Sequence, residues 1–318
     1  MALDEPTASF LRQMAESGAK PLHEMEPHEA RGLGATLRAL YGPGPELDRV
    51  EDVVIAGRQA PIPLRILVPG EDPRAVIVYY HGGGWTMGTL DEYDTLARQL
   101  AQRAHAAVVL VDYRLAPEHP FPAALEDAWT AVQWVETHVE TITSAPIPIV
   151  IAGDSAGGNL AAVIAQRAAD RGAPAIAAQV LIYPVVDADL GTVSYTDPSN
   201  QLMLTREAMT GFWNHYAPDP DVRNSPELSP LRAATYSGLP PAVVITAEHD
   251  VLRDEGEEYA RAMADAGVAV FHRRFEGQMH GFFTLVNVLP GSDDGLNFVA
   301  EHLKRMLSST PTSAGQRR

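Results

Sequence analysis

The segment Gly153–Gly158 carries the spacing most informative for chemistry, Gly-Asp-Ser-Ala-Gly-Gly, with a serine at position 155. It follows the apolar run Pro148–Ala152 and precedes the alanine-rich segment Asn159–Ala169. This order predicts a buried strand, a sharp turn with strained backbone at the serine, and a helix. Glycines at 153 and 157 remove side chains that would collide with the neighbouring strand or helix. Ser155 is therefore a candidate nucleophile, exposed where the helix N–H groups favour negative charge.

A run of three glycines, within His81–Trp85, directly follows another predicted strand. Bare glycine backbone lets N–H groups approach a reacting oxygen closely, as the oxyanion formed in acyl transfer requires. We assign the N–H groups of Gly83, Gly84 and Ala156 as the oxyanion donors, and expect the histidine of the run to hold the loop by hydrogen bonding. A phosphate-binding turn is the alternative, but the run lacks a Gly-Lys-Ser/Thr sequence and the G-x-G-x-x-G spacing.

A serine nucleophile needs a general base, and five of the eleven histidines follow Ser155 in the chain. His272 is expected inside a strand and His302 inside the closing helix, which suits structural or solvated roles. His280 is expected in a loop immediately after the last strand, from which it can reach over the serine hydroxyl. We therefore predict His280 as the base, with His249 as the remaining alternative.

The base in turn needs a carboxylate that orients it and stabilises its imidazolium form. Asp250 comes just after a predicted strand and opens a loop, on the same sheet edge as the serine and the histidine. Asp254 and Glu255 suit the first turn of the next helix, where acidic groups favour the helix dipole. Glu248 is a weaker alternative because its side chain should face elsewhere, and Asp154 is expected to brace the serine turn.

Composition excludes several classes of protein. The chain has 318 residues, 46% of them hydrophobic and 20% charged, a formal charge of −17 and no cysteine. The negative charge argues against nucleic-acid binding and against docking on anionic lipid. The missing cysteines exclude disulfides, zinc-thiolate sites and a cysteine nucleophile. Because we find neither a signal peptide nor an apolar run long enough to span a bilayer, we expect a cytoplasmic protein without stable membrane association.

Apolar strand-like runs alternate with helical patterns along most of the chain. Such alternation predicts an α/β fold, a mostly parallel sheet with helices on both faces and an antiparallel pair at one edge. The predicted strands are 52–56, 63–68, 75–80, 107–112, 147–152, 177–183, 242–247 and 268–275. The predicted helices are 91–103, 122–138, 159–171, 254–266 and 296–307.

Two regions fall outside this alternation, residues 1–45 and residues 185–238. The second is far longer than a usual connection, as expected of a functional lid. We predict that the two regions form a helical cap, that 46–184 and 239–307 form the catalytic domain, and that the tail 308–318 is disordered.

Apolar side chains of the cap and the glycine run are candidate walls of a substrate pocket. Plain packing between cap and sheet is the alternative role for each of them. The candidates are Trp85, Leu204, Phe212, Trp213 and Tyr216, with Phe10 and Met14 from the N-terminal region.

Taken together, these motifs resemble the bacterial hormone-sensitive-lipase-like esterases, also called the GDXG group. The matching pieces run in family order: His81–Trp85, Asp112–Glu118, Gly153–Gly158, Tyr183-Pro184, Ser229–Leu231, Asp250–Gly256 and His280–Phe282. The resemblance implies an α/β-hydrolase fold with eight strands, a helical cap and hydrolysis of carboxylic esters with short to medium acyl chains, without cofactor or metal. It places the catalytic triad at Ser155, Asp250 and His280.

The resemblance also implies homodimerisation through the edge strand Val268–Phe275. One departure is Val251, where the family usually has proline after the acid; we expect it to change loop stiffness and not chemistry. Amide, lactone or N-acyl hydrolysis remains open because the same triad attacks each carbonyl. A non-catalytic small-molecule receptor, as in the plant gibberellin receptors that look like this family, is disfavoured by the complete set of Ser155, Asp250 and His280.

Overall fold

The computed structural model describes residues 2–18 and 20–308, and this part of the chain contains an eight-stranded sheet. The strand order is β1-β2-β4-β3-β5-β6-β7-β8, antiparallel at β1-β2 and β2-β4 and parallel in all other pairs. The strands are β1 (Arg49–Ile55), β2 (Ile62–Val68), β3 (Val76–Tyr80), β4 (Ala107–Val111), β5 (Ile149–Asp154), β6 (Ile176–Ile182), β7 (Ala242–His249) and β8 (Val270–Met279). The predicted α/β-hydrolase fold is confirmed.

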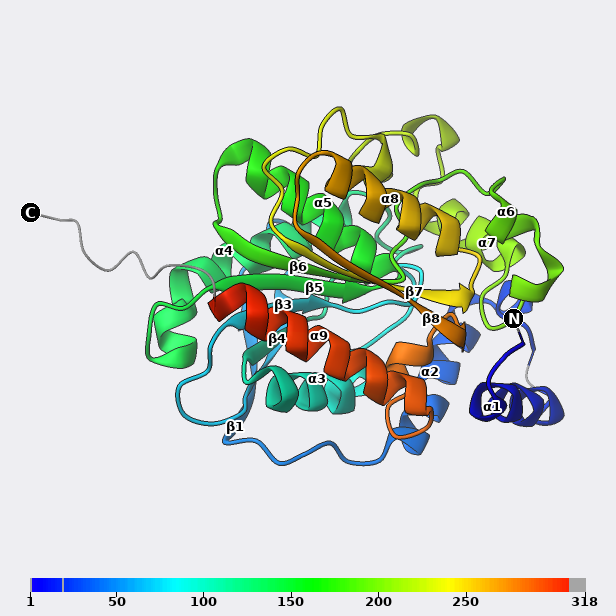
Figure 1. Ribbon diagram of the computed structural model, residues 1–318, viewed down its shortest axis with the longest axis horizontal. Helices are drawn as coiled ribbons and strands as arrows, with labels where there is room; N and C mark the ends of the chain where they lie inside the picture. The colour runs from blue at the N-terminus through cyan, green and yellow to red at the C-terminus, as the bar shows by residue number, and fades with distance from the viewer. Residues whose placement is uncertain (1, 19, 309–318) are drawn as a thin grey trace, which may run out of the picture.

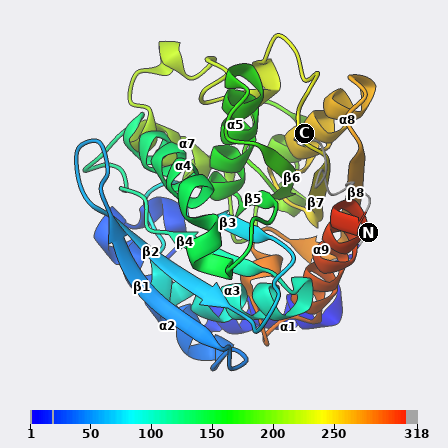
Figure 2. The same ribbon diagram turned by 90° about the vertical axis from the view of Figure 1, so that its left-hand side faces the viewer.

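Helices cover both faces of the sheet. In Figure 2, α4, α5 and α8 lie on one face, and α3 and α9 lie on the other. The α-helices are α1 (Glu5–Glu16), α2 (Pro27–Tyr41), α3 (Leu90–Ala104), α4 (Ala123–Thr143), α5 (Ala156–Arg171), α6 (Val193–Thr196), α7 (Arg206–Tyr216), α8 (Arg253–Asp265) and α9 (Pro290–Ser308). The short 3₁₀ helices are η1 (Leu22–Glu24), η2 (Pro198–Asn200), η3 (Pro220–Val222), η4 (Pro230–Arg232) and η5 (Phe282–Thr284). Within the described ranges, no helix is long and apolar enough to cross a membrane.

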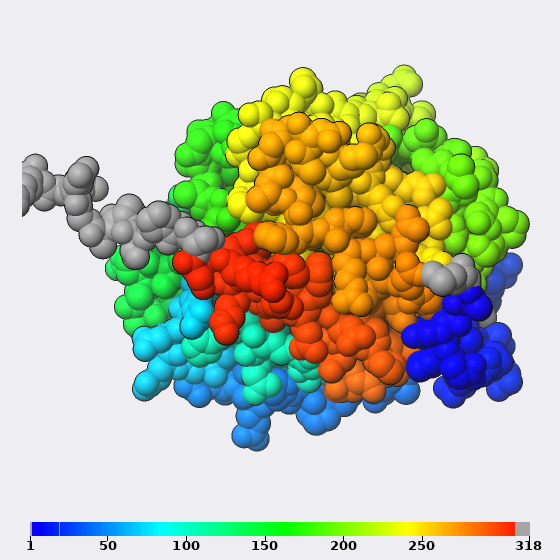
Figure 3. Space-filling model, viewed as in Figure 1, coloured from blue at the N-terminus to red at the C-terminus, as the bar shows by residue number. Residues whose placement is uncertain are grey.

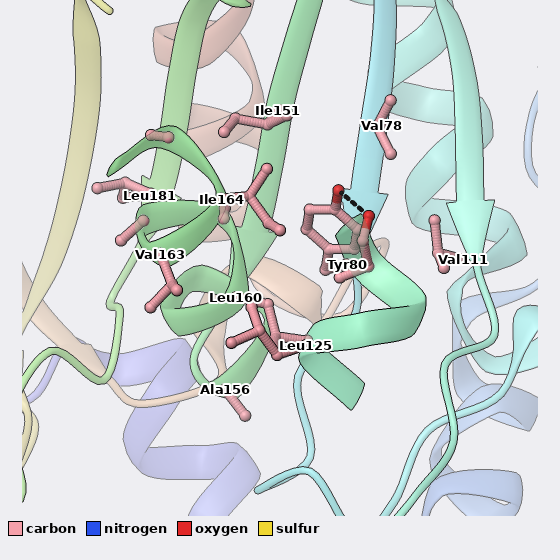
Figure 4. Close-up of a cluster of buried hydrophobic side chains, with 14 of the residues drawn as sticks. Val78, Tyr80, Val111, Leu125, Ile151, Ala156, Leu160, Val163, Ile164 and Leu181 are labelled. Carbon is pink, nitrogen blue, oxygen red and sulfur yellow. Dashed lines mark hydrogen bonds between the residues drawn. The ribbon is translucent and has the colours of Figure 1, made fainter. Parts of the chain in front are cut away.

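The central strands are buried on both faces, which explains their continuous apolar sequences. Every residue of β3 and β4 is buried. Figure 4 shows the core between the sheet and helices α4 and α5, where the Tyr80 hydroxyl donates a hydrogen bond to the carbonyl of Ala128 (3.0 Å). The labelled members of this core are Val78, Tyr80, Val111, Leu125, Ile151, Ala156, Leu160, Val163, Ile164 and Leu181. Because Ala156 belongs to it, the core directly supports the residue after Ser155.

Several elements extend beyond their predicted limits, α9 and β8 among them. Helix α9 begins at Pro290, six positions before the expected start at 296, because its polar first turn hides the apolar periodicity that marks the rest. Strand β8 continues to Met279 through the polar stretch 276–278, and His249 of β7 pairs with Met279. The predicted disordered tail began at 308, but Ser308 is the last residue of α9, and residues 309–318 lie outside the described part of the chain.

The two regions outside the βα alternation lie at the edge of the sheet to which the parallel strands point. Figure 1 shows α1, α2, α6 and α7 gathered there. On the molecular surface, the N-terminal segment (dark blue) also lies against the orange part of the chain that contains β8 (Figure 3). Asp4 N–H donates to the Gly277 carbonyl (3.1 Å), and the Gln278 side-chain amide donates to the Asp4 carboxylate (2.6 Å). These contacts attach the N-terminal region to the end of β8, next to His280.

Candidate active site

Ser155 lies on a strained turn between β5 and α5. Its backbone has φ 55° and ψ −118°, and its N–H donates to the Ile182 carbonyl (2.9 Å). A Cβ atom added at Gly157 would lie 1.9 Å from the Tyr80 carbonyl oxygen, and one at Gly153 would lie 2.2 Å from the Gly157 carbonyl oxygen. Both distances are far inside van der Waals contact, so only glycine fits at either position. The predicted steric role of the two glycines is confirmed.

The ends of three parallel strands bring Ser155, Asp250 and His280 together. Ser155 follows β5, Asp250 follows β7 and His280 follows β8. The His280 imidazole bridges the other two side chains, with Nε2 3.1 Å from Ser155 Oγ and Nδ1 2.8 Å from Asp250 Oδ2. Because a carboxylate only accepts, Nδ1 carries the proton and Nε2 is free to accept one from the serine hydroxyl.

The Asp250 carboxylate is completely buried, while the side chain of His280 keeps 13% of its surface exposed. Asp250 Oδ1 accepts a hydrogen bond from the N–H of Leu252 (2.9 Å), so each carboxylate oxygen has a partner. Burial with both oxygens bonded holds the carboxylate in one orientation. The imidazole is therefore fixed at one end and open to the cavity at the other.

The alternative base and acids are placed elsewhere. His249 is buried in β7, with Nε2 3.8 Å from the Glu248 carboxylate, and Glu248 accepts a hydrogen bond from Gly277 N–H (2.8 Å). Asp254 accepts from Ser194 N–H (2.8 Å), and Glu255 accepts from Val186 N–H (2.8 Å). Asp254 and Glu255 therefore hold the segment after β6 against α8, and burial raises the pKa of Glu255 well above its ordinary value.

The glycine run presents backbone N–H groups beside the serine. Gly83 and Gly84 have φ values of 101° and 59°, which favour glycine. Among the described residues, neither N–H has a hydrogen-bond acceptor. The N–H of Ala156, the first residue of α5, likewise has no acceptor within its helix. The three predicted oxyanion donors are thus available, and their catalytic role remains a prediction.

Asp154 connects the glycine run to the serine turn. Its carboxylate accepts hydrogen bonds from Gly82 N–H (3.0 Å), the Tyr79 hydroxyl (2.9 Å) and the Tyr93 hydroxyl (3.1 Å). Burial raises the pKa of Asp154 to about 6, although these donors oppose the shift. Asp154 was expected to brace the serine turn, but its carboxylate instead bonds to β3, the glycine run and α3. The sequence analysis missed both tyrosines, because no local pattern links them to position 154.

His81 stabilises the glycine run through a hydrogen bond and through stacking of its ring. Its Nδ1–H donates to the Gly82 carbonyl (2.8 Å), and its ring stacks on Tyr113 at 4.2 Å between centroids. The Tyr113 hydroxyl donates to the His81 carbonyl (2.7 Å). Burial lowers the pKa of His81 to about 4, so the ring is neutral at neutral pH. These contacts agree with the expected structural role of His81.

A cavity of about 160 Å³ opens over Ser155 and His280, well above the roughly 10–15 Å³ that one water needs. Two predicted wall residues, Leu204 and Phe212, line it. The sequence analysis predicted none of the other residues as pocket walls, although it placed Gly83 and Gly84 at the site as oxyanion donors. The remaining lining residues are Leu22, Gly34, Leu37, Tyr41, Gly82, Gly83, Gly84, Met87, Gly88, Glu92, Tyr93, Leu96, Asp154, Tyr183, Met203, Gly281 and Thr284.

The prediction that Trp85, Trp213 and Tyr216 line the pocket is wrong for this cavity. All three are fully buried, and Trp85 stacks on Tyr216 (4.3 Å between centroids) and packs against Trp213 (4.9 Å). Large aromatic rings gain most by excluding water on both faces, so they fill the core beneath the glycine run instead. Phe10 and Met14 also do not line the cavity; they pack in the core on the α3–α9 face.

Within residues 2–18 and 20–308, no group of three or more His, Asp or Glu side chains is placed to hold a metal ion. The arrangement can instead supply a nucleophilic hydroxyl, a base with its orienting carboxylate, and backbone donors for an oxyanion.

Comparison with known proteins places the chain in a family. Residues 77–284 match the model of an alpha/beta hydrolase fold family. The chain is 42% identical over 281 residues to carboxylesterase NlhH of Mycobacterium tuberculosis, covering 86% of this chain and 88% of that protein. It is 36% identical over 319 residues to an ethyl acetate hydrolase of Pseudomonas putida, covering 96% of this chain and all of that protein.

Solved structures agree with these sequence relatives. The hyperthermophilic esterase of the archaeon Pyrobaculum calidifontis superposes with a TM-score of 0.88 at 39% identity, covering 96% of this chain and 99% of that one. An ester hydrolase from the metagenome of Lake Arreo, complexed with a phosphonate derivative, gives a TM-score of 0.91 at 33% identity over 96% of this chain and all of that one. The chain therefore belongs to the hormone-sensitive-lipase-like carboxylesterases of the α/β-hydrolase superfamily.

Proposed function

We propose that this carboxylesterase cleaves small carboxylic esters with Ser155 as nucleophile, His280 as general base and acid, and Asp250 as the orienting carboxylate. The observation that carries the proposal is the imidazole of His280, hydrogen-bonded to the serine hydroxyl at 3.1 Å and to the buried carboxylate at 2.8 Å. A nucleophile, a base and an orienting acid in hydrogen-bonding sequence are what acyl transfer to a serine needs.

The reaction has two halves. In the first, His280 Nε2 takes the proton from Ser155 Oγ as the oxygen attacks the ester carbonyl carbon. The N–H groups of Gly83, Gly84 and Ala156 stabilise the resulting oxyanion, and Asp250 stabilises the imidazolium. The carbon–oxygen bond to the alcohol then breaks, and the alcohol leaves with the proton from His280. In the second half, His280 takes a proton from water as the water oxygen attacks the acyl carbon. The bond from that carbon to Ser155 Oγ then breaks, and His280 returns the proton to the serine oxygen as the acid leaves.

We propose that the preferred substrates have short to medium acyl chains. Support comes from the bounded, mostly apolar cavity over the serine and from relatives named for carboxylic esters and for ethyl acetate. The helices α1, α2 and α7 at the strand ends support the proposal that residues 1–45 and 185–238 act as a cap (Figure 1). Homodimerisation through the edge strand β8 stays a prediction.

The experiment is the substitution Ser155→Ala, assayed on a series of p-nitrophenyl esters from acetate to palmitate. We expect the variant to lose at least about a thousandfold in kcat, since removing a serine nucleophile leaves only binding and oxyanion stabilisation. A fluorophosphonate probe should label the wild-type protein at one equivalent and leave the variant unlabelled.

Two controls make the result specific. Ser237→Ala removes an exposed serine that does not line the cavity, and it should keep full activity. Unchanged circular dichroism of Ser155→Ala would show that its fold is intact. Turnover retained in Ser155→Ala would reject the assignment, a wild-type maximum at palmitate would reject the chain-length proposal, and turnover of the matching p-nitroanilide would extend the activity to amides.

A further inference from the structure

The cavity over Ser155 is mostly apolar, but its wall between α2 and α3 contains an acidic side chain. Glu92, in the first turn of α3, lines the same cavity as Ser155 and His280. A carboxylate is costly in this wall, because the other side chains that α2 and α3 contribute to it are leucines and tyrosines. A positively charged group bound next to Glu92 would offset this cost.

The neighbouring helix leaves room for this carboxylate. Gly34 lies in the interior of α2, where glycine is about 1 kcal/mol less favourable than alanine. A Cβ atom at Gly34 would lie 2.5 Å from Glu92 Oε2, inside the contact distance. Gly34 therefore lets the carboxylate rest against α2 at the cavity wall, and a larger side chain would displace it.

Among residues 2–18 and 20–308, no basic side chain forms an ion pair with Glu92. In the described part of the chain, Glu92 forms no ion pair, and the nearby Arg38 instead pairs with Asp91 at 3.1 Å on the surface. The start of α3 is capped by Thr89, whose hydroxyl accepts from the Glu92 backbone N–H (3.3 Å). Burial raises the pKa of Glu92 despite Thr89 and Arg38 nearby, as expected of a carboxyl group whose charge is incompletely compensated.

Aromatic rings lie in the same part of the cavity. Tyr41 and Tyr93 both line it. Burial raises the pKa of the Tyr41 hydroxyl, and the nearby Glu92 carboxylate adds to that shift. Aromatic faces attract cations, and together with a carboxylate they form a setting suited to an ammonium group. A neutral apolar substituent would gain nothing from Glu92.

We propose that Glu92 is a specificity-determining residue that selects esters carrying a positively charged ammonium group on the acyl or the alcohol arm. The proposal rests on the proposed ester hydrolysis at Ser155 and names a substrate class for it. The ammonium group would lie against Glu92 and the tyrosine rings while the ester carbonyl lies at Ser155.

The test uses two pairs of esters of nearly equal shape that differ in charge. For the acyl arm, p-nitrophenyl 4-(trimethylammonio)butanoate is compared with p-nitrophenyl 5,5-dimethylhexanoate. For the alcohol arm, acetylcholine is compared with 3,3-dimethylbutyl acetate. The readout is the ratio of kcat/KM for the charged ester to that for the neutral one. We expect a ratio above one in at least one pair for the wild-type protein, and a decrease of about tenfold to a hundredfold in Glu92→Gln.

Asp91→Asn is the matched control. It removes the same charge from the same turn of α3, but Asp91 is exposed and does not line the cavity. We expect this variant to change the ratio by less than about twofold, since exposed charges are strongly screened. Gly34→Ala retains the charge and displaces the carboxylate, so it should lower the ratio as Glu92→Gln does, and it keeps the proposal testable should Glu92→Gln fold poorly.

The outcomes separate this inference from the proposed function. If the wild-type protein hydrolyses the neutral esters and the ratio in Glu92→Gln matches wild type in both pairs, the ammonium proposal is wrong and ester hydrolysis stands. A decrease in Asp91→Asn as large as in Glu92→Gln would also overturn it, by showing a general charge effect. If the wild-type protein hydrolyses none of the four esters, the proposed function itself fails.

Discussion

The strand ends and the outer wall of the cavity meet at one site, but they are built in different ways. At the strand ends, backbone geometry and hydrogen bonds fix Ser155, Asp250 and His280, with distances of 3.1 and 2.8 Å between their side chains. The outer wall comes from the regions predicted as a cap, and apolar packing positions its side chains. The outer wall is Leu22, Leu37, Met203, Leu204 and Phe212.

This difference separates the reaction from the choice of substrate. Strand ends of a parallel sheet place polar residues at one edge with little freedom, so the reacting groups depend on the most rigid part of the fold. The outer wall can change its side chains without disturbing the sheet, so it is free to set the shape of the substrate. The two regions touch directly at Gly84, whose added Cβ would lie 2.3 Å from the Phe212 ring.

Gly84→Ala is expected to give the largest effect among tests of this comparison. The new methyl group meets the Phe212 ring and also disfavours the φ of 59°, so the glycine run should shift and misplace its N–H donors. Loss of an oxyanion donor typically lowers kcat by about a hundredfold to a thousandfold. Steady-state kinetics on p-nitrophenyl butanoate measure the change.

Two variants sharpen that result. Gly32→Ala, at a helical glycine with no heavy atom within 4 Å of the added Cβ, should keep full activity. Adding Phe212→Ala to Gly84→Ala removes the collision, so partial recovery would assign the loss to contact between the two regions. Equal losses in the single and double variants would assign it to backbone strain alone, and full activity of Gly84→Ala would contradict the predicted oxyanion role.

Asp154→Asn tests how the buried carboxyl group at the end of β5 affects the pH dependence of stability. The folded-state pKa of Asp154 is about 6, above the ordinary value of 3.8, so between these values the folded protein holds a proton that the unfolded chain has lost. Protonated Asp154 therefore stabilises the folded state by about 3 kcal/mol below pH 3.8. This contribution to the free energy of unfolding is lost as the pH rises to about 6. The Asn variant lacks this loss.

Urea unfolding of both proteins at several pH values measures the difference in their free energies of unfolding. The other carboxyl groups are common to both proteins, so the difference isolates Asp154. We expect the variant to gain stability relative to wild type as pH rises from about 4 to about 6, and no further change above that. A difference that does not vary with pH would contradict the raised pKa.

The strand ends could be predicted from the sequence because local patterns specify them. Glycines on both sides of Ser155 relieve collisions that any strand–turn–helix of this kind would have, and Asp250 and His280 each follow an apolar strand. The end of β8 was placed too early, at Phe275, because the polar residues 276–278 form an irregularity in the register with β7 and leave no apolar signal before Met279 pairs with His249. Backbone pairing depends on the neighbouring strand, which one segment cannot reveal.

The outer wall could be predicted only in part. Leu204 and Phe212 line the cavity, as predicted. Trp85, which was predicted on the same ground of apolar character, lies in the core. Which side of a ring faces a cavity depends on helices distant in sequence. Glu92 was missed for the same reason, because an acid in the first turn of a helix is ordinary until α2 is seen to lie against it.

Leu204→Ala is expected to give the smallest effect and to test the outer wall alone. Leu204 is 5% exposed and lines the cavity, so the truncation enlarges space that substrate already enters. Each additional methylene of an acyl chain that becomes buried should favour binding by about 0.8 kcal/mol, or about fourfold. The preferred p-nitrophenyl ester should therefore lengthen by one or two carbons, with kcat for the acetate nearly unchanged.

The matched variant is Leu160→Ala, which removes the same atoms from the core beneath the serine turn, where Leu160 is fully buried (Figure 4). It should cost about 2–5 kcal/mol of stability because it leaves a cavity that substrate does not reach, and the preferred acyl length should stay the same. If Leu160→Ala changed the preferred length as much as Leu204→Ala, substrate choice would depend on the rigidity of the sheet, and the separation of the two regions would be wrong.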